Sequence, residues 1–229
     1  MRELIVNADD FGRSERTNDG IVRAHEHGIV TSASLMVRWP AARGAAAYAR
    51  ANPRLSVGLH LDLGEWAYSA GRWSRVYEHP PTAAELSGQL EYFRELVGRD
   101  PTHVDSHQHV HRDEPLATHA AELADALGVP LRERGPIRYV GGFYGQSGRG
   151  EPCPSLIEVE ALVRVVASLE PGVTELGCHP GLDAELDSSY RLERLLEVRT
   201  LCHPRAREAI ARAGVILRSF AAQAAGARS

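Results

Sequence analysis

Short apolar runs alternate with longer amphipathic stretches along the whole chain of 229 residues, and this alternation constrains the fold more than any other feature. A short apolar run is typical of a strand covered on both faces, whereas apolar residues at helical spacing are typical of an amphipathic helix. Repeated strand–helix units predict a parallel sheet with helices packed against it.

The apolar runs predict strands at residues 4–8, 31–37, 56–63, 102–106, 129–132, 173–178 and 215–219. The amphipathic stretches predict helices at residues 17–27, 41–51, 83–97, 115–127 and 155–168, and helical segments within 192–213. Gly28 and Gly128 directly follow two of these helices, and Pro53 follows a third. Glycine and proline commonly occupy such positions at helix ends.

Polar residues at strand ends decide between an open sheet and a barrel. The residues at or just past the carboxyl ends of four expected strands are Asp9, Asp10, His60, His107 and His179. In a barrel those ends meet at one mouth, whereas an open sheet gathers only the residues near its switch point. We therefore expect an α/β fold with a single (β/α) barrel, TIM-barrel-like, irregular or with fewer than eight strands, and one domain over residues 1–229.

Charge and composition exclude several classes of partner. The formal net charge of −4 leaves no basic field for nucleic acid or an anionic membrane surface. No apolar stretch approaches the ~18 residues of a membrane span, and the first residues enter an apolar strand without a signal-peptide pattern. The three cysteines form no Cys-x-x-Cys pair, which fits a reducing compartment. We therefore expect no nucleic acid, no membrane and a cytoplasmic location.

Two adjacent carboxylates, Asp9 and Asp10, stand in the segment Asn7-Ala-Asp-Asp-Phe-Gly12 directly after an apolar strand. Neighbouring carboxylates repel each other unless a cation or hydrogen bonds compensate, so the pair suggests metal binding or acid–base chemistry. A turn that caps the next helix is the alternative, because Asp, Asn and Gly are common in turns.

His60 lies in the alternating strand segment 58–63, on the same face as Asp62. Alone, such a residue is more typical of a core histidine whose hydrogen bonds are satisfied. It becomes a candidate metal ligand only in the company of the other polar residues at the expected barrel mouth.

Segment 103–111, His-Val-Asp-Ser-His-Gln-His-Val-His, is the most informative part of the chain. In an extended backbone the residues on one face are His103, Asp105, His107, His109 and His111. Burying so many imidazoles without metal or carboxylate partners would be costly. A solvated edge is disfavoured because the segment falls in the middle of the parallel pattern. We therefore predict metal binding by at least one of these histidines.

His179 ends a late strand and is followed by the turn-forming pair Pro180-Gly181. A general acid and a plain turn histidine are both open interpretations. Cys178 precedes it, but neighbours on a strand point to opposite faces, which disfavours a Cys–His nucleophile. One carboxylate and two imidazoles from the set above would suit a borderline divalent ion and leave positions open for water and substrate.

Four segments carry a resemblance to a known family. They are Asn7-Ala-Asp-Asp-Phe-Gly12, Gly58-Leu-His-Leu61, Thr102-His-Val-Asp-Ser-His-Gln-His-Val-His111 and Cys178-His-Pro180. In this order they resemble the YdjC-like carbohydrate deacetylases, which include chitooligosaccharide deacetylases, over nearly the whole chain. The resemblance implies a TIM-barrel-like fold, an Asp-His-His metal site and hydrolysis of N-acetyl groups on sugars.

Matched position by position, the resemblance implies that Asp10, His60 and His107 hold a divalent metal ion, Mg²⁺ or Zn²⁺. It implies that Asp9 is the base and His179 the acid. The implied substrate is a small acetylated amino sugar, a di- or oligosaccharide of the N-acetylglucosamine type. Segments 64–81 and 135–154 do not align with a known substrate loop.

Two segments near the expected site have open roles. The aromatic residues that follow the His60 strand are Trp66, Tyr68, Trp73 and Tyr77. Their flat faces suit the apolar faces of sugar rings, and packing of a loop lid explains them equally well. The glycine-rich segment 141–150 lacks dinucleotide or P-loop spacing, so we expect a mobile loop over the site.

Two other functions stay open at this point. A 2-His-1-carboxylate iron oxygenase uses the same ligand types, and a non-catalytic metal- or sugar-binding protein would keep the pocket without turnover. The presence of both Asp9 and His179 disfavours the two alternatives. The sequence leaves the oligomeric state open, and a homodimer is one candidate, since it is the commonest symmetric oligomer.

Overall fold

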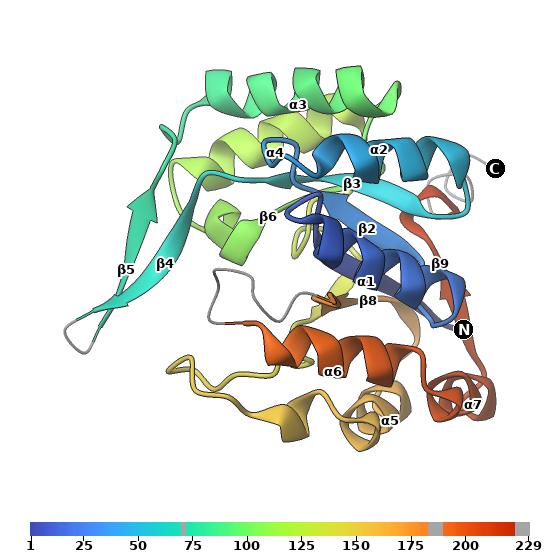
Figure 1. Cartoon of the computed structure of the whole chain (residues 1–229). Helices are drawn as coiled ribbons and strands as arrows, with labels where there is room; N and C mark the ends of the chain where they lie inside the picture. Colours follow the sequence, from blue (N-terminus) through green and yellow to red (C-terminus); the bar gives the residue numbers. More distant parts are fainter. Residues whose placement is uncertain (70–71, 183–189, 223–229) are drawn as a thin grey trace.

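The computed structural model describes residues 1–69, 72–182 and 190–222. Within them a curled sheet of seven strands has the order β6-β3-β2-β1-β8-β7, with β9 beside the first part of β1 (Figure 1). Every pairing among these strands is parallel. This confirms the predicted α/β fold with an irregular barrel-like sheet.

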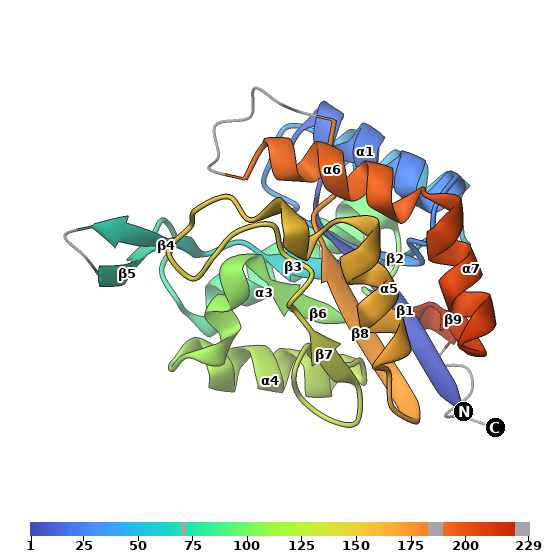
Figure 2. The ribbon, with the colours of Figure 1, turned by 90° about the horizontal axis from the view of Figure 1, so that it is seen from below.

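The helices lie around the curled sheet (Figures 1 and 2). The strands are β1 (Arg2–Phe11), β2 (Ser32–Leu35), β3 (Ser56–Leu61), β6 (Val104–Ser106), β7 (Arg138–Val140), β8 (Gly172–Cys178) and β9 (Val215–Arg218). The helices are α1 (Glu15–Glu26), α2 (Ala42–Ala51), α3 (Ala83–Val97), α4 (Leu116–Leu127), α5 (Val159–Ala167), α6 (Leu192–Leu201) and α7 (Pro204–Arg212).

Local sequence explains where several helices begin and end. The Ser14 side chain accepts a hydrogen bond from the Thr17 N–H at the start of α1, and Thr82 caps α3 in the same way. Gly98 and Gly128 adopt left-handed backbones after α3 and α4, with φ of 78° and 64°. The predicted bounds of α3 are confirmed residue for residue.

The strand expected at 129–132 is wrong. Leu131 makes only isolated bridges, to Val104 and to Arg134, and Glu133 turns the chain with a left-handed φ of 62°. The edge strand β7 forms instead at Arg138–Val140, where it pairs with β8. The turn places Arg132 inside the curled sheet, where it is 4% exposed.

The backbone of segment 103–111 is extended only as far as Ser106, where the strand expected at 102–106 ends. Strand β6 ends at Ser106, and a 3₁₀ segment, η1, covers His107–Arg112. Gln108 and His109 both have left-handed backbones, with φ of 48° and 54°. The histidines therefore do not share one face.

The excursion after β3 is an antiparallel hairpin of β4 (Gly64–Ser69) and β5 (Arg72–Tyr77). It projects from the body of the molecule as an arm (Figure 1). The helix expected at 155–168 is divided into a short 3₁₀ turn, η2 (Pro154–Leu156), and α5.

The amino end of the sheet is closed by the chain after β9. The ring of Phe220 stacks on His103 with centroids 3.8 Å apart.

No helix in the described ranges is long and apolar enough to cross a membrane. A single domain over residues 1–229, a cytoplasmic location and a homodimer stay predictions.

Candidate active site

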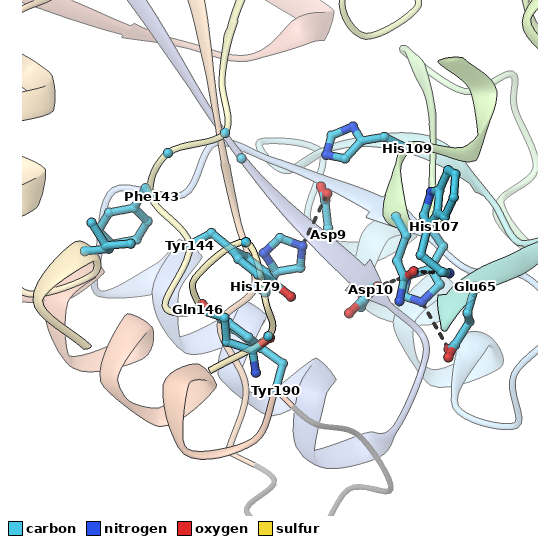
Figure 3. Close-up of a pocket in the computed structure, with 18 of the residues that line it drawn as sticks. Asp9, Asp10, Glu65, His107, His109, Phe143, Tyr144, Gln146, His179 and Tyr190 are labelled. Atoms are coloured by element: carbon cyan, nitrogen blue, oxygen red, sulfur yellow. Dashed lines mark hydrogen bonds and ion pairs between the residues drawn. The ribbon is translucent and has the colours of Figure 1, made fainter. Parts of the chain in front are cut away.

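The candidate site is a pocket of about 740 Å³ at the carboxyl ends of the strands (Figure 3). Asp9 and Asp10 lie near the end of β1, His107 follows β6 and His179 follows β8, and all four line this pocket. His60 lies near the end of β3, with Nε2 3.6 Å from Asp10. The structure therefore brings together the five residues singled out in the sequence.

A β-bulge explains how two neighbouring carboxylates reach the same pocket. The register of β1 with β2 shifts between Ala8 and Phe11, where β1 has an extra residue. Asp10 has a left-handed φ of 66° at this point. Neighbours on a regular strand point to opposite faces, but the bulge turns Asp10 toward the pocket that Asp9 faces. Such strained backbone positions cluster at functional sites.

Asp10, His60 and His107 form a buried cluster. Asp10 Oδ1 lies 3.2 Å from His107 Nδ1 and 3.6 Å from His60 Nε2, and one possible ligand atom from each residue lies within 4.8 Å of the others. His60 Nε2 is buried and has no hydrogen-bond partner among the described residues. An unpartnered nitrogen beside a carboxylate and a second imidazole fits a divalent ion, so the donor set suits a metal.

A carboxylate orients each imidazole of the cluster. Asp105 Oδ1 lies 2.7 Å from His60 Nδ1, and Glu65 Oε1 lies 3.3 Å from His107 Nε2. The Ser34 hydroxyl in turn donates to Asp105 at 2.7 Å. A carboxylate on the second ring nitrogen fixes the ring and makes the other nitrogen a better ligand.

Opposite charges set the protonation of the cluster. Burial favours the neutral form of Asp10, but the charges of Arg194 and His107 outweigh it and hold the pKa well below its usual range. Burial favours neutral His60, but the Asp105 charge, the Asp105 hydrogen bond to Nδ1 and the Asp10 carboxylate 3.6 Å from Nε2 raise its pKa to about 10. A metal ion takes the deprotonated ring, so binding must displace this proton.

Arg132 is the centre of a buried charge network beside the cluster. It donates to both oxygens of Asp9, at 2.6 and 2.7 Å, and lies 2.7 Å from Asp105 and from Glu175. Burial would raise the pKa of Asp9, but the Arg132 charge and hydrogen bond lower it. Burial also raises the pKa of Glu175, to about 7, against the charge of Arg132. Arg132 thus keeps Asp9 ionised and fixed.

His179 faces Asp9 from the end of β8, with Nε2 3.7 Å from Asp9 Oδ2 (Figure 3). Its backbone N–H donates to Glu197. The rings of Tyr144 and Tyr190 stand edge-on to the imidazole, with centroids 5.3 and 5.7 Å away. Burial lowers the pKa of His179 to about 4, so the ring is neutral near pH 7.

The other histidines of segment 103–111 lie outside the metal cluster. His109 lines the pocket, with Nε2 3.3 Å from the Tyr139 hydroxyl. His109, His111 and Glu133 are close enough together to hold an ion. Both ring nitrogens of His111 are already hydrogen-bonded within the protein, so this set suits a metal less well.

The aromatic excursion contributes two side chains to the pocket. Trp66 and Trp73 line it together with glycines of segment 141–150, whereas Tyr77 is not among the lining residues. The side chain of Tyr68 lies outside the described part of the structure. The expected position of the glycine-rich segment at the site is confirmed, and its mobility stays a prediction.

Several charged residues of the site were missed in the sequence. They are Arg13, Glu65, Arg132, Arg194 and Glu197. Arg132 follows a short apolar run and carries no motif. Arg194 and Glu197 stand one helical turn apart on α6, where both are buried. The charged residues of the helix that follows the His179 loop were the sequence feature that could have indicated these two site residues.

The family model for YdjC-like proteins matches residues 3–212. The chain belongs to this family. Chitooligosaccharide deacetylase of Serratia marcescens is 35% identical, over 95% of this chain and 97% of the relative. Carbohydrate deacetylase of Geobacillus stearothermophilus is 32% identical, over 96% and 97%. The structure of an Enterococcus faecalis protein described as a cellobiose-phosphate cleavage protein is 26% identical, with a TM-score of 0.79 over 97% of this chain and 98% of that one.

Membership of the YdjC-like family confirms the resemblance drawn from the four sequence motifs, because the match spans all of them. The solved relative shares the fold over nearly its full length.

Proposed function

We propose that this YdjC-like chain is a metal-dependent hydrolase that removes acetyl groups from N-acetylated amino sugars, namely di- or oligosaccharides of the N-acetylglucosamine type. The observation that carries the proposal is one pocket in which the Asp10–His60–His107 cluster lies beside Asp9 and His179. The names of the relatives, chitooligosaccharide deacetylase and carbohydrate deacetylase, support the substrate class.

Asp10, His60 and His107 would hold the divalent ion. Bound there, the ion would polarise the acetyl carbonyl and lower the pKa of the attacking water. Zinc and magnesium are the candidate ions. Two imidazole donors favour zinc, since magnesium prefers oxygen ligands.

Asp9 is the proposed general base. It lies in the pocket, and its two oxygens are held by Arg132, so the orientation of the carboxylate does not depend on the substrate. A carboxylate fixed in this way is already oriented to accept the proton of the attacking water, so no reorientation is needed before the reaction.

His179 is the proposed general acid. Its Nε2 lies 3.7 Å from Asp9 Oδ2, so a proton accepted by Asp9 has a short path to the imidazole. The amine of an amide leaves poorly unless it is protonated, and His179 lines the pocket where the amine would form.

Acetate release tests the proposal. The panel contains N-acetylglucosamine and its disaccharide, each assayed with chelated protein and with protein resupplied with zinc or magnesium. We expect acetate only from the resupplied protein. Absence of acetate from both sugars, with one ion bound per chain, would contradict the proposed reaction and favour a metal- or sugar-binding protein.

The same three ligand types also occur in 2-His-1-carboxylate iron oxygenases. Hydrolysis needs no oxygen, whereas an oxygenase does. Acetate release that is equal under air and under nitrogen therefore separates the two reactions, and the Arg132–Asp9 pair favours hydrolysis because it supplies a fixed base.

A further inference from the structure

His179 differs from the two histidines of the metal cluster in the way it is held. His60 and His107 each have a carboxylate beside the second ring nitrogen. Nδ1 of His179 is buried and has no hydrogen-bond partner in the part of the chain that the structure describes. The orientation of the proposed acid must therefore come from contacts to its backbone and to the faces and edges of its ring.

Helix α6 supplies the backbone contacts. Glu197, which is fully buried on this helix, accepts a hydrogen bond from the His179 N–H through Oε2. The Arg194 guanidinium, one helical turn earlier, donates to the His179 carbonyl oxygen at 3.4 Å. Both polar groups of the His179 backbone are thus bonded to α6, so the residue cannot rotate about its main chain without breaking one of these bonds.

The Tyr190 hydroxyl connects the same carboxyl group to the glycine-rich segment 141–150. It is hydrogen-bonded to Glu197 Oε1, and it accepts from the Gly145 N–H at 2.8 Å. The ring of Tyr190 stacks on Tyr144 with centroids 4.4 Å apart, and both rings stand edge-on to the imidazole of the proposed acid (Figure 3). The segment, the two tyrosines and α6 therefore form one bonded unit around that imidazole.

The close approach of this segment to α6 depends on a glycine. A Cβ on Gly145 would stand 2.6 Å from Ile157 Cδ1 and 2.9 Å from Glu193 Cγ. The Gly145 carbonyl oxygen accepts from the Cys153 N–H at 2.6 Å, so the segment is also closed on itself. The Gly145 N–H is therefore held where it can donate to the Tyr190 hydroxyl.

The backbone contact leaves the imidazole uncharged. A carboxylate bonded to Nδ1 would stabilise the imidazolium and make it a weaker acid. Glu197 contacts the His179 N–H instead, and burial lowers the pKa of the His179 ring to about 4. A proton that this ring takes up is therefore given up readily to a departing amine.

The bonds of Glu197 do not require its negative charge. Burial raises the pKa of this carboxyl group to about 8, so it is largely protonated near pH 7. A protonated carboxyl group can donate from Oε1 to the Tyr190 oxygen while Oε2 still accepts from the His179 N–H. Glutamine has the same pattern of one donor and one acceptor, which makes Glu197→Gln a conservative variant.

We infer that Glu197 is a positioning residue for His179, and that the Tyr190 hydroxyl extends its hold to segment 141–150, so that the proposed acid and one wall of the pocket are held together. Glu197 acts through the backbone of His179 and takes no part in the proton transfer itself. This inference rests on the proposed deacetylase function and adds to it the residues that hold its acid.

Three substitutions test the parts of this unit. Glu197→Leu removes both bonds of the carboxyl group, whereas Glu197→Gln keeps both. Tyr190→Phe removes the bond to Gly145 and keeps the ring, and it is the milder variant should Glu197→Leu fail to fold. Tyr48→Phe is the matched control, because the Tyr48 hydroxyl donates to Glu26 at 3.0 Å and lies outside the pocket lining.

The first experiment compares kcat for acetate release from the N-acetylglucosamine disaccharide and from an aryl acetate ester, using metal-loaded enzyme. The amide needs the acid, whereas the ester does not. We expect Glu197→Leu to lower kcat on the sugar by about 100-fold, the cost of misplacing a reacting group, and to leave kcat on the ester nearly unchanged. Tyr190→Phe should lower kcat on the sugar by about tenfold, the effect of one hydrogen bond.

Glu197→Gln and Tyr48→Phe should keep kcat on both substrates near the wild-type values. Losses of equal size on the sugar and the ester in Glu197→Leu and Tyr190→Phe would overturn the inference, because a general loss of structure affects both reactions. A loss in Glu197→Gln as large as in Glu197→Leu would also overturn it.

Amide hydrogen exchange keeps the inference separate from the proposed reaction, since it needs no turnover. Glu197→Leu should speed the exchange of the His179 N–H by about tenfold, because its acceptor is removed. Tyr190→Phe should do the same for the Gly145 N–H, and Tyr48→Phe should change neither. Unchanged exchange of both amides would contradict the inference alone. Wild-type enzyme that releases no acetate from any sugar would contradict the deacetylase function.

Discussion

Arg132 and Asp9 are joined by a two-point contact, in which two guanidinium nitrogens lie 2.6 and 2.7 Å from the two carboxylate oxygens. Arg132 comes from the turn after α4 and Asp9 from β1, and both side chains are buried. A planar fork fixes the plane of the carboxylate it binds. The orientation of the proposed base is therefore set by a residue distant in sequence.

Arg132→Lys keeps the charge but cannot make the two-point contact. We expect kcat for acetate release to fall by about 100-fold, the cost of misplacing a reacting group. Arg132→Met should also destabilise the fold by about 3–5 kcal/mol, because it leaves buried carboxylates without their cation. Urea unfolding measures the second effect, and wild-type kcat in Arg132→Lys would contradict the positioning role.

Asp105→Asn should weaken metal binding by about 10- to 100-fold, since Asp105 orients His60 from the ring nitrogen opposite the cluster. The affinity is measured by competition with a chelator. Asp62→Asn is the control, because the Asp62 carboxylate lies two residues beyond His60 and accepts its hydrogen bond from Trp39 instead. Equal affinities in the two variants would argue against the Asp10–His60–His107 site.

His179→Ala should lose far more activity on N-acetyl sugars than on an aryl acetate ester. An aryl oxide leaves without protonation, whereas the amine of an amide needs a proton from an acid. The measurement is the ratio of kcat/KM for the N-acetyl sugar to kcat/KM for the ester, in wild type and variant. The metal content of the variant is measured as the control. A loss of the same size on both substrates would remove the general-acid role from His179.

Buried neutral histidines predict how stability depends on pH. Burial lowers the pKa of His109 to about 3 and of His103, His111 and His179 to about 4. An unfolded histidine takes up a proton near pH 6.5, so between about 6.5 and 4 the unfolded chain binds more protons than the native one. The contribution of these four histidines to the free energy of unfolding is therefore complete above pH 6.5 and falls as the pH falls toward 4. The raised pKa of His60 acts in the opposite direction above pH 6.5, so stability should be highest near pH 6.5.

Urea unfolding between pH 7.5 and 5 checks this dependence. His103→Gln can keep polar contacts to Ser34 and Thr102, and it should flatten the curve because one titrating group is removed. His27→Gln changes a side chain that is 71% exposed and should leave the curve unchanged. Identical curves for wild type and His103→Gln would contradict the assignment of a neutral buried ring.

Gly20 lies against the loop that follows His179. A Cβ on residue 20 would stand 2.4 Å from Gly181 Cα, and backbone cannot move aside as a flexible side chain can. We expect Gly20→Ala to lower both Tm and kcat. Gly88→Ala in α3 meets nothing within 4 Å and should stabilise the fold by up to ~1 kcal/mol. A Gly20→Ala protein with wild-type Tm and kcat would contradict this close approach.

The positions of the candidate ligands could be predicted because each follows an apolar run. Asp10, His60 and His107 stand at strand ends, and parallel strands gather their carboxyl ends at one mouth. The bounds of α3 were also predictable, since Thr82 and Gly98 mark them.

The remaining features could not be predicted from the sequence because they depend on tertiary contacts. The bulge that turns Asp10 into the pocket and the left-handed backbone at Gln108 and His109 depend on contacts across the sheet. Arg132 and Arg194 look like surface residues in the sequence. They are buried because carboxylates on other strands compensate their charges, and no local pattern records such partners.

The most direct test of the metal-dependent reaction is a titration of chelated enzyme with zinc, in which acetate release from the N-acetylglucosamine disaccharide is followed against ion added per chain. Activity should rise from zero and level off at one equivalent, and a His60→Ala variant should stay inactive over the same range. Full activity in the chelated enzyme, or in His60→Ala without added metal, would contradict a reaction that depends on the Asp10–His60–His107 site.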